Sequence, residues 1–212
     1  MRVLAVETST LAGGVALLDE ERIVGEYLLD VRVTHSERLM VAIDRVLADA
    51  GWVVGDLDGI AVSIGPGSFT GLRIGLGTVK GLAFARPVPI AAVPTLDAMA
   101  AALPFSSLPV CPVIEARKGE IYTSRYTWDG VRMRREWEYL AMTPSELVAR
   151  LETPVIVLGD GAAQITSPFA QRAPVSRRSP SPAVVAELGI ERLRRRETVP
   201  ASEIVPLYLK PS

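Results

Sequence analysis

The fold of this chain is decided by the stretch Gly65-Pro66-Gly67-Ser68-Phe69-Thr70-Gly71-Leu72-Arg73-Ile74-Gly75. An apolar, β-branched run at residues 60–64 precedes it and predicts a strand, and the run at 70–85 predicts a helix. A glycine-rich turn between a strand and a helix aims backbone N–H groups and the helix N-terminus at an anion. The alternative at this point is an ordinary connection in which the glycines only turn the chain.

The predicted helix at 70–85 carries four glycines in two pairs at four-residue spacing, Gly71 with Gly75 and Gly77 with Gly81. Each glycine destabilises a helix by about 1 kcal/mol relative to alanine. We therefore expect another group to approach the backbone of this helix closely. Ser68 or Thr70 is suited to be its N-cap.

The first half of the chain orders its strands and helices as β, β, β, helix, β, helix, β, helix. Residues 1–9 are expected to form an apolar strand that ends in Glu7, Thr8 and Ser9. The later elements are expected at residues 15–19, 23–29, 36–49, 60–64, 70–85, 88–93 and 95–103. A strand that ends in a carboxylate and two hydroxyls resembles the first phosphate loop of the actin, sugar-kinase and heat-shock ATPase (ASKHA) superfamily. This resemblance implies an α/β fold of two related domains, each of βββαβαβα type.

A domain boundary is expected at residues 103–109, where two prolines and two serines interrupt the pattern. The predicted domains are residues 1–105 and residues 106–212. The second domain should contain strands at 110–115, 120–128, 131–139 and 154–158, a helix capped by Thr143, and a final helix at 183–196. It repeats the opening order of the first domain in abbreviated form, which indicates a duplicated ASKHA-like fold.

Five segments together resemble the TsaB (YeaZ) family of bacterial proteins, and they span the chain from end to end. These segments are Thr8-Ser9-Thr10, residues 35–39, residues 65–75, residues 116–122 and residues 206–210. The sequence departs from the family at Glu7 and Glu115, where the family usually has aspartate.

The resemblance implies a non-catalytic scaffold or activating subunit rather than an enzyme. Such a subunit dimerises with TsaD, which has the same fold and transfers a threonylcarbamoyl group to the adenosine next to the tRNA anticodon. It also implies TsaE, a small ATPase, in the larger complex, a homodimer when the subunit is alone, and only indirect contact with tRNA. No cofactor is expected.

The composition limits the partners and the compartment. The 212 residues carry a net charge of −1, so no overall positive field favours nucleic acid. The single cysteine, Cys111, cannot form an internal disulfide, which fits a reducing compartment. The apolar run before Glu7 is too short for a signal-peptide core, and no run reaches membrane-spanning length. We therefore expect a cytoplasmic protein without a membrane segment.

The single histidine, His35, excludes two kinds of catalytic site. It cannot form the His-x-x-x-His pair through which TsaD holds a metal, and a catalytic zinc site needs three protein ligands. We therefore expect no metal. The segment around Ser68 has the wrong spacing for a Gly-x-Ser-x-Gly nucleophile, and His35 would be its only base. His35 is expected at a helix start or in an interface.

A residual anion site is predicted where the first strand end meets the glycine-rich turn. Its residues are Glu7, Thr8, Ser9, Gly65, Gly67 and Ser68. The alternative for Glu7 is a carboxylate that accepts backbone hydrogen bonds at a strand end. An alternative function, a small kinase-like phosphotransferase of the ASKHA fold, would use this loop. The single loop at 159–163 is small for the adenosine-binding part of such an enzyme.

A protein–protein interface is predicted on the helices at 36–49 and 70–85. The second of these is apolar on nearly every side, and one sheet can cover only one side of a helix. The predicted interface residues are His35, Glu37, Arg38, Leu39, Ile43, Leu72, Arg73, Gly75, Leu76, Val79 and Lys80. A third possible function is therefore a stand-alone homodimeric interaction protein.

The arginines at 192 and 194–196 have two interpretations, contact with tRNA phosphates or a solvated helix end. Glu191 lies four residues before Arg195, and cations suit the C-terminus of a helix. The solvated helix end is favoured.

Overall fold

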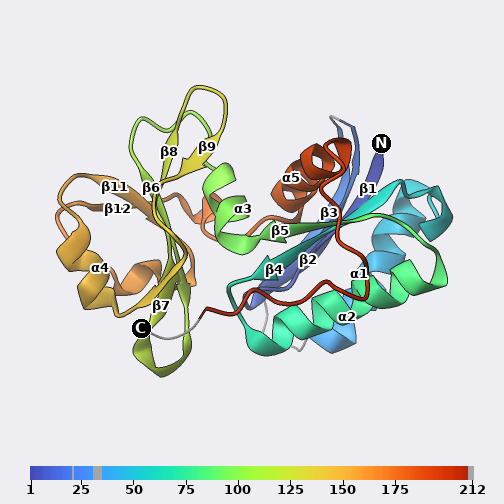
Figure 1. Cartoon of the computed structure of the whole chain (residues 1–212), viewed down its shortest axis with the longest axis horizontal. Helices are drawn as coiled ribbons and strands as arrows, with labels where there is room; N and C mark the ends of the chain where they lie inside the picture. Colours follow the sequence, from blue (N-terminus) through green and yellow to red (C-terminus); the bar gives the residue numbers. More distant parts are fainter. Residues whose placement is uncertain (21, 31–34, 210–212) are drawn as a thin grey trace. The chain divides into compact units, whose positions relative to one another are not determined.

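The computed structural model describes residues 1–20, 22–30 and 35–209, and for residues 35 and 36 it describes only the backbone. The chain divides into two compact units (Figure 1). The N-terminal unit contains Met1–Pro94 and Ser181–Leu207, and the second unit contains Thr95–Pro180 and the residues from Tyr208 onward. This division differs from the expected domains at 1–105 and 106–212, because the last helix returns to the N-terminal unit.

The N-terminal unit is built on a five-stranded sheet in the order β3-β2-β1-β4-β5. Its strands are β1 (Arg2–Glu7), β2 (Ala12–Asp19), β3 (Arg22–Asp30), β4 (Gly59–Gly65) and β5 (Ile90–Pro94). The pairs β1–β2 and β2–β3 are antiparallel, whereas β1–β4 and β4–β5 are parallel. Because β1 and β4 are parallel neighbours, their carboxyl ends at Glu7 and Gly65 meet at one edge of the sheet.

Helices cover both faces of this sheet (Figure 1). The helices α1 (His35–Ala50) and α2 (Phe69–Ala85) share a hydrophobic core with Ile60 and Val62 of β4. Helix α5 (Pro182–Arg194) packs on the other face, where Gly189 lies against Ala61. Alternate residues of β4 thus face opposite helices, as the two-residue period of a strand requires.

The start of α5 is fixed to the edge strand β3 by a carboxylate. Glu26 Oε1 accepts hydrogen bonds from Ser181 Oγ at 2.8 Å and from the Ala183 backbone N–H at 3.1 Å. These bonds satisfy a donor at the helix N-terminus, where a negative charge also suits the helix dipole. Together with the packing of α5 on the sheet, they explain why this helix belongs to the N-terminal unit.

The second unit contains a seven-stranded sheet whose main path is β10-β7-β6-β11-β12. The strands on this path are β6 (Val110–Glu115), β7 (Ile121–Thr123), β10 (Leu140–Met142), β11 (Val155–Leu158) and β12 (Ala170–Arg172). The hairpin of β8 (Tyr126–Trp128) and β9 (Met133–Arg135) lies off this path. The helical segments are α3 (Thr95–Ala101), η2 (Arg117–Gly119), α4 (Pro144–Arg150), η3 (Asp160–Gln164) and η4 (Val175–Arg177).

The two sheets have matching strand orders, β3-β2-β1-β4-β5 and β10-β7-β6-β11-β12. The helix α1 joins β3 to β4, and α4 correspondingly joins β10 to β11. After β11, however, the short turn η3 stands where α2 follows β4. The expected duplication and the abbreviation of the second half are both present.

Two predicted strands of the second unit are each divided in the structure. The expected strand at 120–128 is β7 and β8, and the expected strand at 131–139 contains only β9, with β10 starting at Leu140. The division falls at Arg125, whose carbonyl oxygen accepts hydrogen bonds from the backbone N–H groups of Glu136 and Trp137. By contrast, the capping box of α4 is confirmed, since Thr143 N–H donates to Glu146 Oε2 at 2.7 Å.

Candidate functional site

The glycine-rich turn connects β4 to α2 as the sequence predicts. Gly65 ends the strand with a φ of 106°, in the left-handed region that favours glycine. The Ser68 hydroxyl accepts a hydrogen bond from the Gly71 N–H at 3.2 Å, which confirms the predicted N-cap. The Leu207 N–H donates to the Ile64 carbonyl at 2.7 Å, so the segment after α5 also contacts this turn.

The group that approaches the backbone of α2 is the chain's own β1–β2 loop. A Cβ atom at Gly67 would overlap the Ser9 carbonyl oxygen, and one at Gly75 would overlap Thr8 Oγ1. The Ser68 N–H also donates to the Ser9 carbonyl at 2.6 Å. The predicted close approach is thus satisfied within the N-terminal unit at Gly75. Gly77, in contrast, faces open space.

The Glu7 carboxyl group lies at the centre of this arrangement and is completely buried. Its Oε1 accepts hydrogen bonds from the Ser9 N–H at 2.6 Å and from Ser9 Oγ. Its Oε2 has no hydrogen-bond partner. Burial raises the pKa of Glu7, while the hydrogen bonds from Ser9 and the nearby Ser63 hydroxyl oppose that rise. Glu7 therefore accepts a backbone donor at a strand end, as the alternative interpretation expects.

The structure brings the six residues of the predicted anion site together, but it closes the site to solvent. The side chains of Glu7, Thr8 and Ser9 are fully buried, whereas Ser68 is exposed. An anion site at these residues therefore stays a prediction, and the observed geometry is that of a sealed loop.

The predicted interface residues divide into two groups by burial. Six of them lie in the core of the N-terminal unit, which corrects their expected place on a docking surface: Leu39, Ile43, Leu72, Gly75, Leu76 and Val79. Leu39, Ile43, Leu76 and Val79 belong to the core that α1 and α2 share with the sheet, and Gly75 lies against Thr8. Glu37 and Arg73 are exposed, and Arg38 and Lys80 are half-buried. The side chain of His35 lies outside the described residues, although His35 begins α1.

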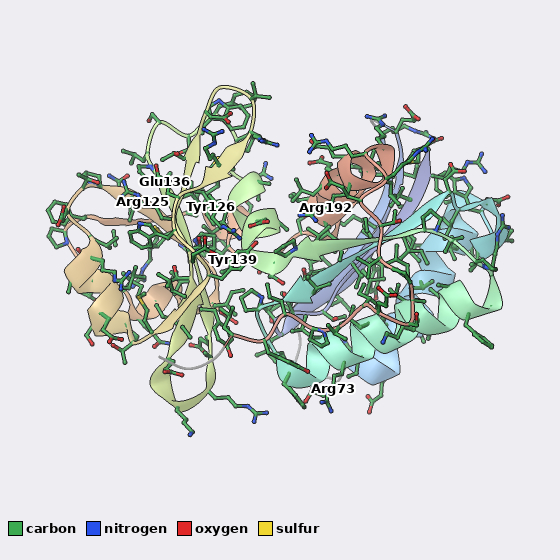
Figure 2. The ribbon with its side chains drawn as sticks, in the orientation of Figure 1. Arg73, Arg125, Tyr126, Glu136, Tyr139 and Arg192 are labelled. Carbon is green, nitrogen blue, oxygen red and sulfur yellow. The ribbon has the colours of Figure 1, made fainter. Side chains whose placement is uncertain are left out.

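The outer surface of α1 and α2 also exposes apolar residues that are not in the predicted interface set. Exposed on these helices are Met40, Val41, Phe69 and Phe84. The Arg73 guanidinium lies 3.9 Å from the centre of the Phe69 ring, and Figure 2 shows Arg73 pointing away from the sheet. We call Met40, Val41, Phe69 and Arg73 the helical face. An exposed apolar group beside a stacked arginine is typical of a protein interface.

A groove lies next to the helical face, between β3 and α1. Its volume is about 770 Å³, and it is lined by Tyr27, Leu29, Glu37, Arg38, Val41, Ala42, Arg45 and Asp49. Arg45 and Asp49 form an ion pair at 2.8 Å within it. The groove combines apolar walls with charges of both signs, so it extends the surface that a protein partner can contact.

The second unit has a corresponding strand end at Glu115, the last residue of β6. Glu115 is exposed, and its Oε1 accepts a hydrogen bond from Gln164 Nε2 at 2.8 Å. The Glu115 N–H donates to Asp160 Oδ1 at 2.9 Å, and burial raises the pKa of Asp160. The turn η3 therefore lies directly against the end of β6.

A polar cluster in the second unit gives no signal in the sequence, because its members come from different elements. Asp97 Oδ1 accepts hydrogen bonds from the Tyr126 hydroxyl at 2.7 Å and from the Tyr139 hydroxyl at 2.9 Å. Figure 2 labels the two tyrosines. Burial and the Asp97 carboxylate both raise the pKa values of these tyrosines. Tyr126 and Tyr139 belong to, or pack against, a hydrophobic core, so the cluster holds α3 in place.

The remaining candidates are structural. Cys111 is buried, and burial raises the pKa of its thiol to about 12. Among the side chains that the structure describes, those of residues 1–20, 22–30 and 37–209, no group of three or more His, Cys, Asp or Glu could hold a metal ion. Arg194 pairs with Glu20 at 3.1 Å and Arg195 with Glu191 at 3.7 Å, which favours the solvated helix end. No helix in the described part of the chain has the length and apolar character to cross a membrane.

Comparisons with known proteins agree with this architecture. The family model described as TsaD, tRNA N6-adenosine threonylcarbamoyltransferase, matches residues 30–175. The tRNA threonylcarbamoyladenosine biosynthesis protein TsaB of Bacillus subtilis is 30% identical over 99% of this chain and 94% of its own length. The TsaB protein of Haemophilus influenzae is 31% identical over the same shares.

Solved structures show the fold. YeaZ from Pseudomonas aeruginosa is similar with a TM-score of 0.85 and 30% identity, over 98% of this chain and 99% of that chain. The activator of the 2-hydroxyisocaproyl-CoA dehydratase from Clostridium difficile has a TM-score of 0.58 at 8% identity, over 99% and 100% of the two chains. At that identity the likeness concerns the fold alone, and it agrees with the predicted α/β ASKHA-like fold. From its sequence, its fold and its relatives, the chain belongs to the TsaB (YeaZ) family, whose curated members take part in the biosynthesis of threonylcarbamoyladenosine on tRNA.

Proposed function

We propose that this protein is a non-catalytic subunit that docks onto a TsaD-type transferase and supports threonylcarbamoyl transfer to tRNA. The observation that carries this proposal is the helical face, an exposed apolar surface with a stacked arginine beside a groove. The names of the relatives supply the pathway. The match of a TsaD family model to residues 30–175 supports a partner of the same fold, because related folds often pair through equivalent surfaces.

The sealed loop at Glu7 supports the non-catalytic part of the proposal. A catalytic carboxylate must reach its substrate within hydrogen-bond distance. Glu7 is fully buried, and one of its oxygens accepts both donors of Ser9. The kinase-like phosphotransferase remains the rival proposal, because a protein of this fold has been solved with bound ADPNP. An enzyme of that kind would have to open the loop around Glu7.

The proposal extends to the other members of the assembly. We propose a homodimer through the same helical face when the transferase is absent, TsaE as a third member, and indirect contact with tRNA. The ion pairs of Arg194 and Arg195 support the last point, since paired arginines attract phosphates less. The protein would act in the cytoplasm, where tRNA is modified.

Docking is tested with two valines that have similar exposure. Val41 lies in the helical face and is 66% exposed, whereas Val175 lies in the second unit and is 77% exposed. Val41→Glu should weaken binding to the TsaD-type transferase of the same organism by tenfold or more, because it places a charge in an apolar contact. Val175→Glu is the matched control and should bind like the wild type. Isothermal titration calorimetry with the purified proteins measures both affinities.

The catalytic question needs a separate assay. The wild-type chain alone should give only background ATP hydrolysis and no threonylcarbamoyl transfer to tRNA. Turnover that exceeds background and is lost in Glu7→Gln would favour the phosphotransferase.

In the docking experiment, equal binding of Val41→Glu and Val175→Glu to the transferase would show that the interface lies elsewhere.

A further inference from the structure

The Glu7 carboxyl group lacks the partners that a buried carboxylate needs. Glu7 and Ser63 are both 0% exposed, and Glu7 Oε2 and Ser63 Oγ have no hydrogen-bond partner. An unpaired buried charge is far less stable than an unpaired neutral group. The structure therefore contains two orphaned polar atoms in a region that water does not reach.

The strand register places these two groups side by side. Val6 of β1 pairs with Val62 of β4, so Glu7 and Ser63 follow at neighbouring positions of the two parallel strands. By the alternation of a strand, Ser63 points to the same face as Ala61, which contacts Gly189 of α5. The first half of α5 is buried and apolar, with Val184, Val185 and Ala186 in the core.

The elements packed against β1 bring no charge to Glu7. These elements are β2, β4, α2 and α5. Their charged residues within the described part of the chain are Asp19 on β2, Arg73 and Lys80 on α2, and Glu187, Glu191, Arg192 and Arg194 on α5. All of them are at least partly exposed, and β4 has none. The groups that shift the pKa of Glu7 are Ser9 and Ser63 together with burial.

We propose that Glu7 is a neutral carboxylic acid in the folded protein, with its proton on Oε2 and directed at the Ser63 hydroxyl oxygen. A Ser63 hydroxyl that donated to an ionised Oε2 would still leave a buried charge with no cation beside it. The proton removes that charge and lets Oε2 donate to Ser63 Oγ. Oε1 remains the acceptor for Ser9. The proton comes from solvent as the chain folds, so folding near neutral pH takes up one proton.

This proton makes the stability of the N-terminal unit depend on pH. An unfolded glutamate has a pKa of about 4.3, and burial raises the folded value. The folded state then binds more protons than the unfolded state between these two pKa values. Stability is therefore complete below the unfolded pKa and is lost as the pH rises through the folded pKa. In that window the unfolding equilibrium constant should increase about tenfold per pH unit.

The direct test is the titration of the glutamate side chains by NMR in the wild-type protein labelled with ¹³C at glutamate Cδ. One glutamate should remain protonated well above pH 4.3, and its signal should be absent from Glu7→Gln. If Glu7→Gln does not fold, Ser9→Ala provides a second way to assign the signal of the protonated glutamate to Glu7. It removes a hydrogen bond that favours the charged form, so the pKa of the same signal should rise further. Glutamate signals that all titrate near 4.3 would overturn the proposal.

Urea unfolding between pH 5 and pH 8 gives an independent readout. The wild type should lose stability as the pH rises. The control Glu115→Gln should behave in the same way, because Glu115 is exposed at the corresponding strand end and Glu7 is unchanged in this variant. Glu7→Gln, which is always neutral, should lack this dependence. The same slope in all three proteins would mean that another group takes up the proton, and the assignment to Glu7 would be wrong.

Discussion

The two units end their central strands with the same residue type in opposite environments. Glu7 ends β1 and is fully buried, whereas Glu115 ends β6 and is exposed. The neighbouring parallel strands also end alike, with Gly65 at a φ of 106° and Gly159 at a φ of 111°. The backbone turn is thus repeated, while the burial is not.

The difference comes from the segment after the glycine turn. In the N-terminal unit this segment is the 17 residues of α2, and Gly75 of this helix lies against Thr8. In the second unit it is only the 5 residues of η3, and Asp160 contacts the backbone of Glu115 instead. A full helix packs against Thr8, which directly follows Glu7, whereas the short turn lies beside a carboxylate that stays in solvent. Duplication therefore preserves the turn, whereas the segment that follows it and the burial of the carboxylate both differ.

Of the substitutions that test this difference between the units, Gly75→Val should change the free energy of unfolding most, because it forces α2 away from the β1–β2 loop. The new side chain overlaps Thr8, so we expect a destabilisation of about 3 kcal/mol or more. Gly77→Ala is the control on the same helix, where a Cβ meets open space, and it should stabilise by about 0.5–1 kcal/mol. Urea unfolding followed by the fluorescence of Trp52, which lies in the core of the N-terminal unit, measures both changes. Similar effects of the two substitutions would contradict the sealed loop.

Replacing each strand-end glutamate by alanine sharpens the comparison. Glu7→Ala leaves both donors of Ser9 without their acceptor in a buried site, so it should destabilise by about 1–3 kcal/mol. Glu115→Ala removes only an exposed hydrogen bond and should change stability by less than about 0.5 kcal/mol. Unfolding at pH 5, monitored by circular dichroism, compares the two. An equal loss would show that the burial of Glu7 has no energetic consequence.

The helix caps offer the smallest expected effect and compare α2 with α4. Ser68→Ala and Thr143→Ala each remove one side-chain acceptor at an N-terminus and should each destabilise by about 1 kcal/mol. Thr143 also takes part in a capping box, so Thr143→Ala should cost slightly more than Ser68→Ala. Amide hydrogen exchange of the first turn of each helix reports the local change. A larger loss at Ser68 would indicate that Ser68 also stabilises the β1–β2 loop.

Local signals in the sequence predicted much of the N-terminal unit. The glycine turn, the N-cap at Ser68 and the order of strands and helices depend on residues that are near one another in the chain. Local sequence signals could not predict which side of α2 is buried. Its apolar residues surround the helix, and only the packing against α1 and the sheet decides that Leu72, Leu76 and Val79 point inward.

Features that depend on distant residues gave no signal. The return of α5 to the N-terminal unit rests on Glu26 and on small residues such as Gly189, neither of which marks a helix partner in the sequence. The close packing of Thr8 and Ser9 likewise depends on Gly75 and Gly67 of a later segment. An interface on α1 and α2 stays a prediction, and which residues of these helices are exposed could be identified only from the packed structure.

The return of α5 has a consequence for synthesis on the ribosome. The sheet of the N-terminal unit is complete once β5 has emerged, yet the helix that covers one of its faces begins only at Pro182. At the usual elongation rates the intervening chain takes on the order of 5 to 20 seconds to appear. During that interval the second unit is synthesised in full, while the alanines of β4 and β5 that face α5 stay uncovered. The unit that is translated first is therefore the one that finishes folding last.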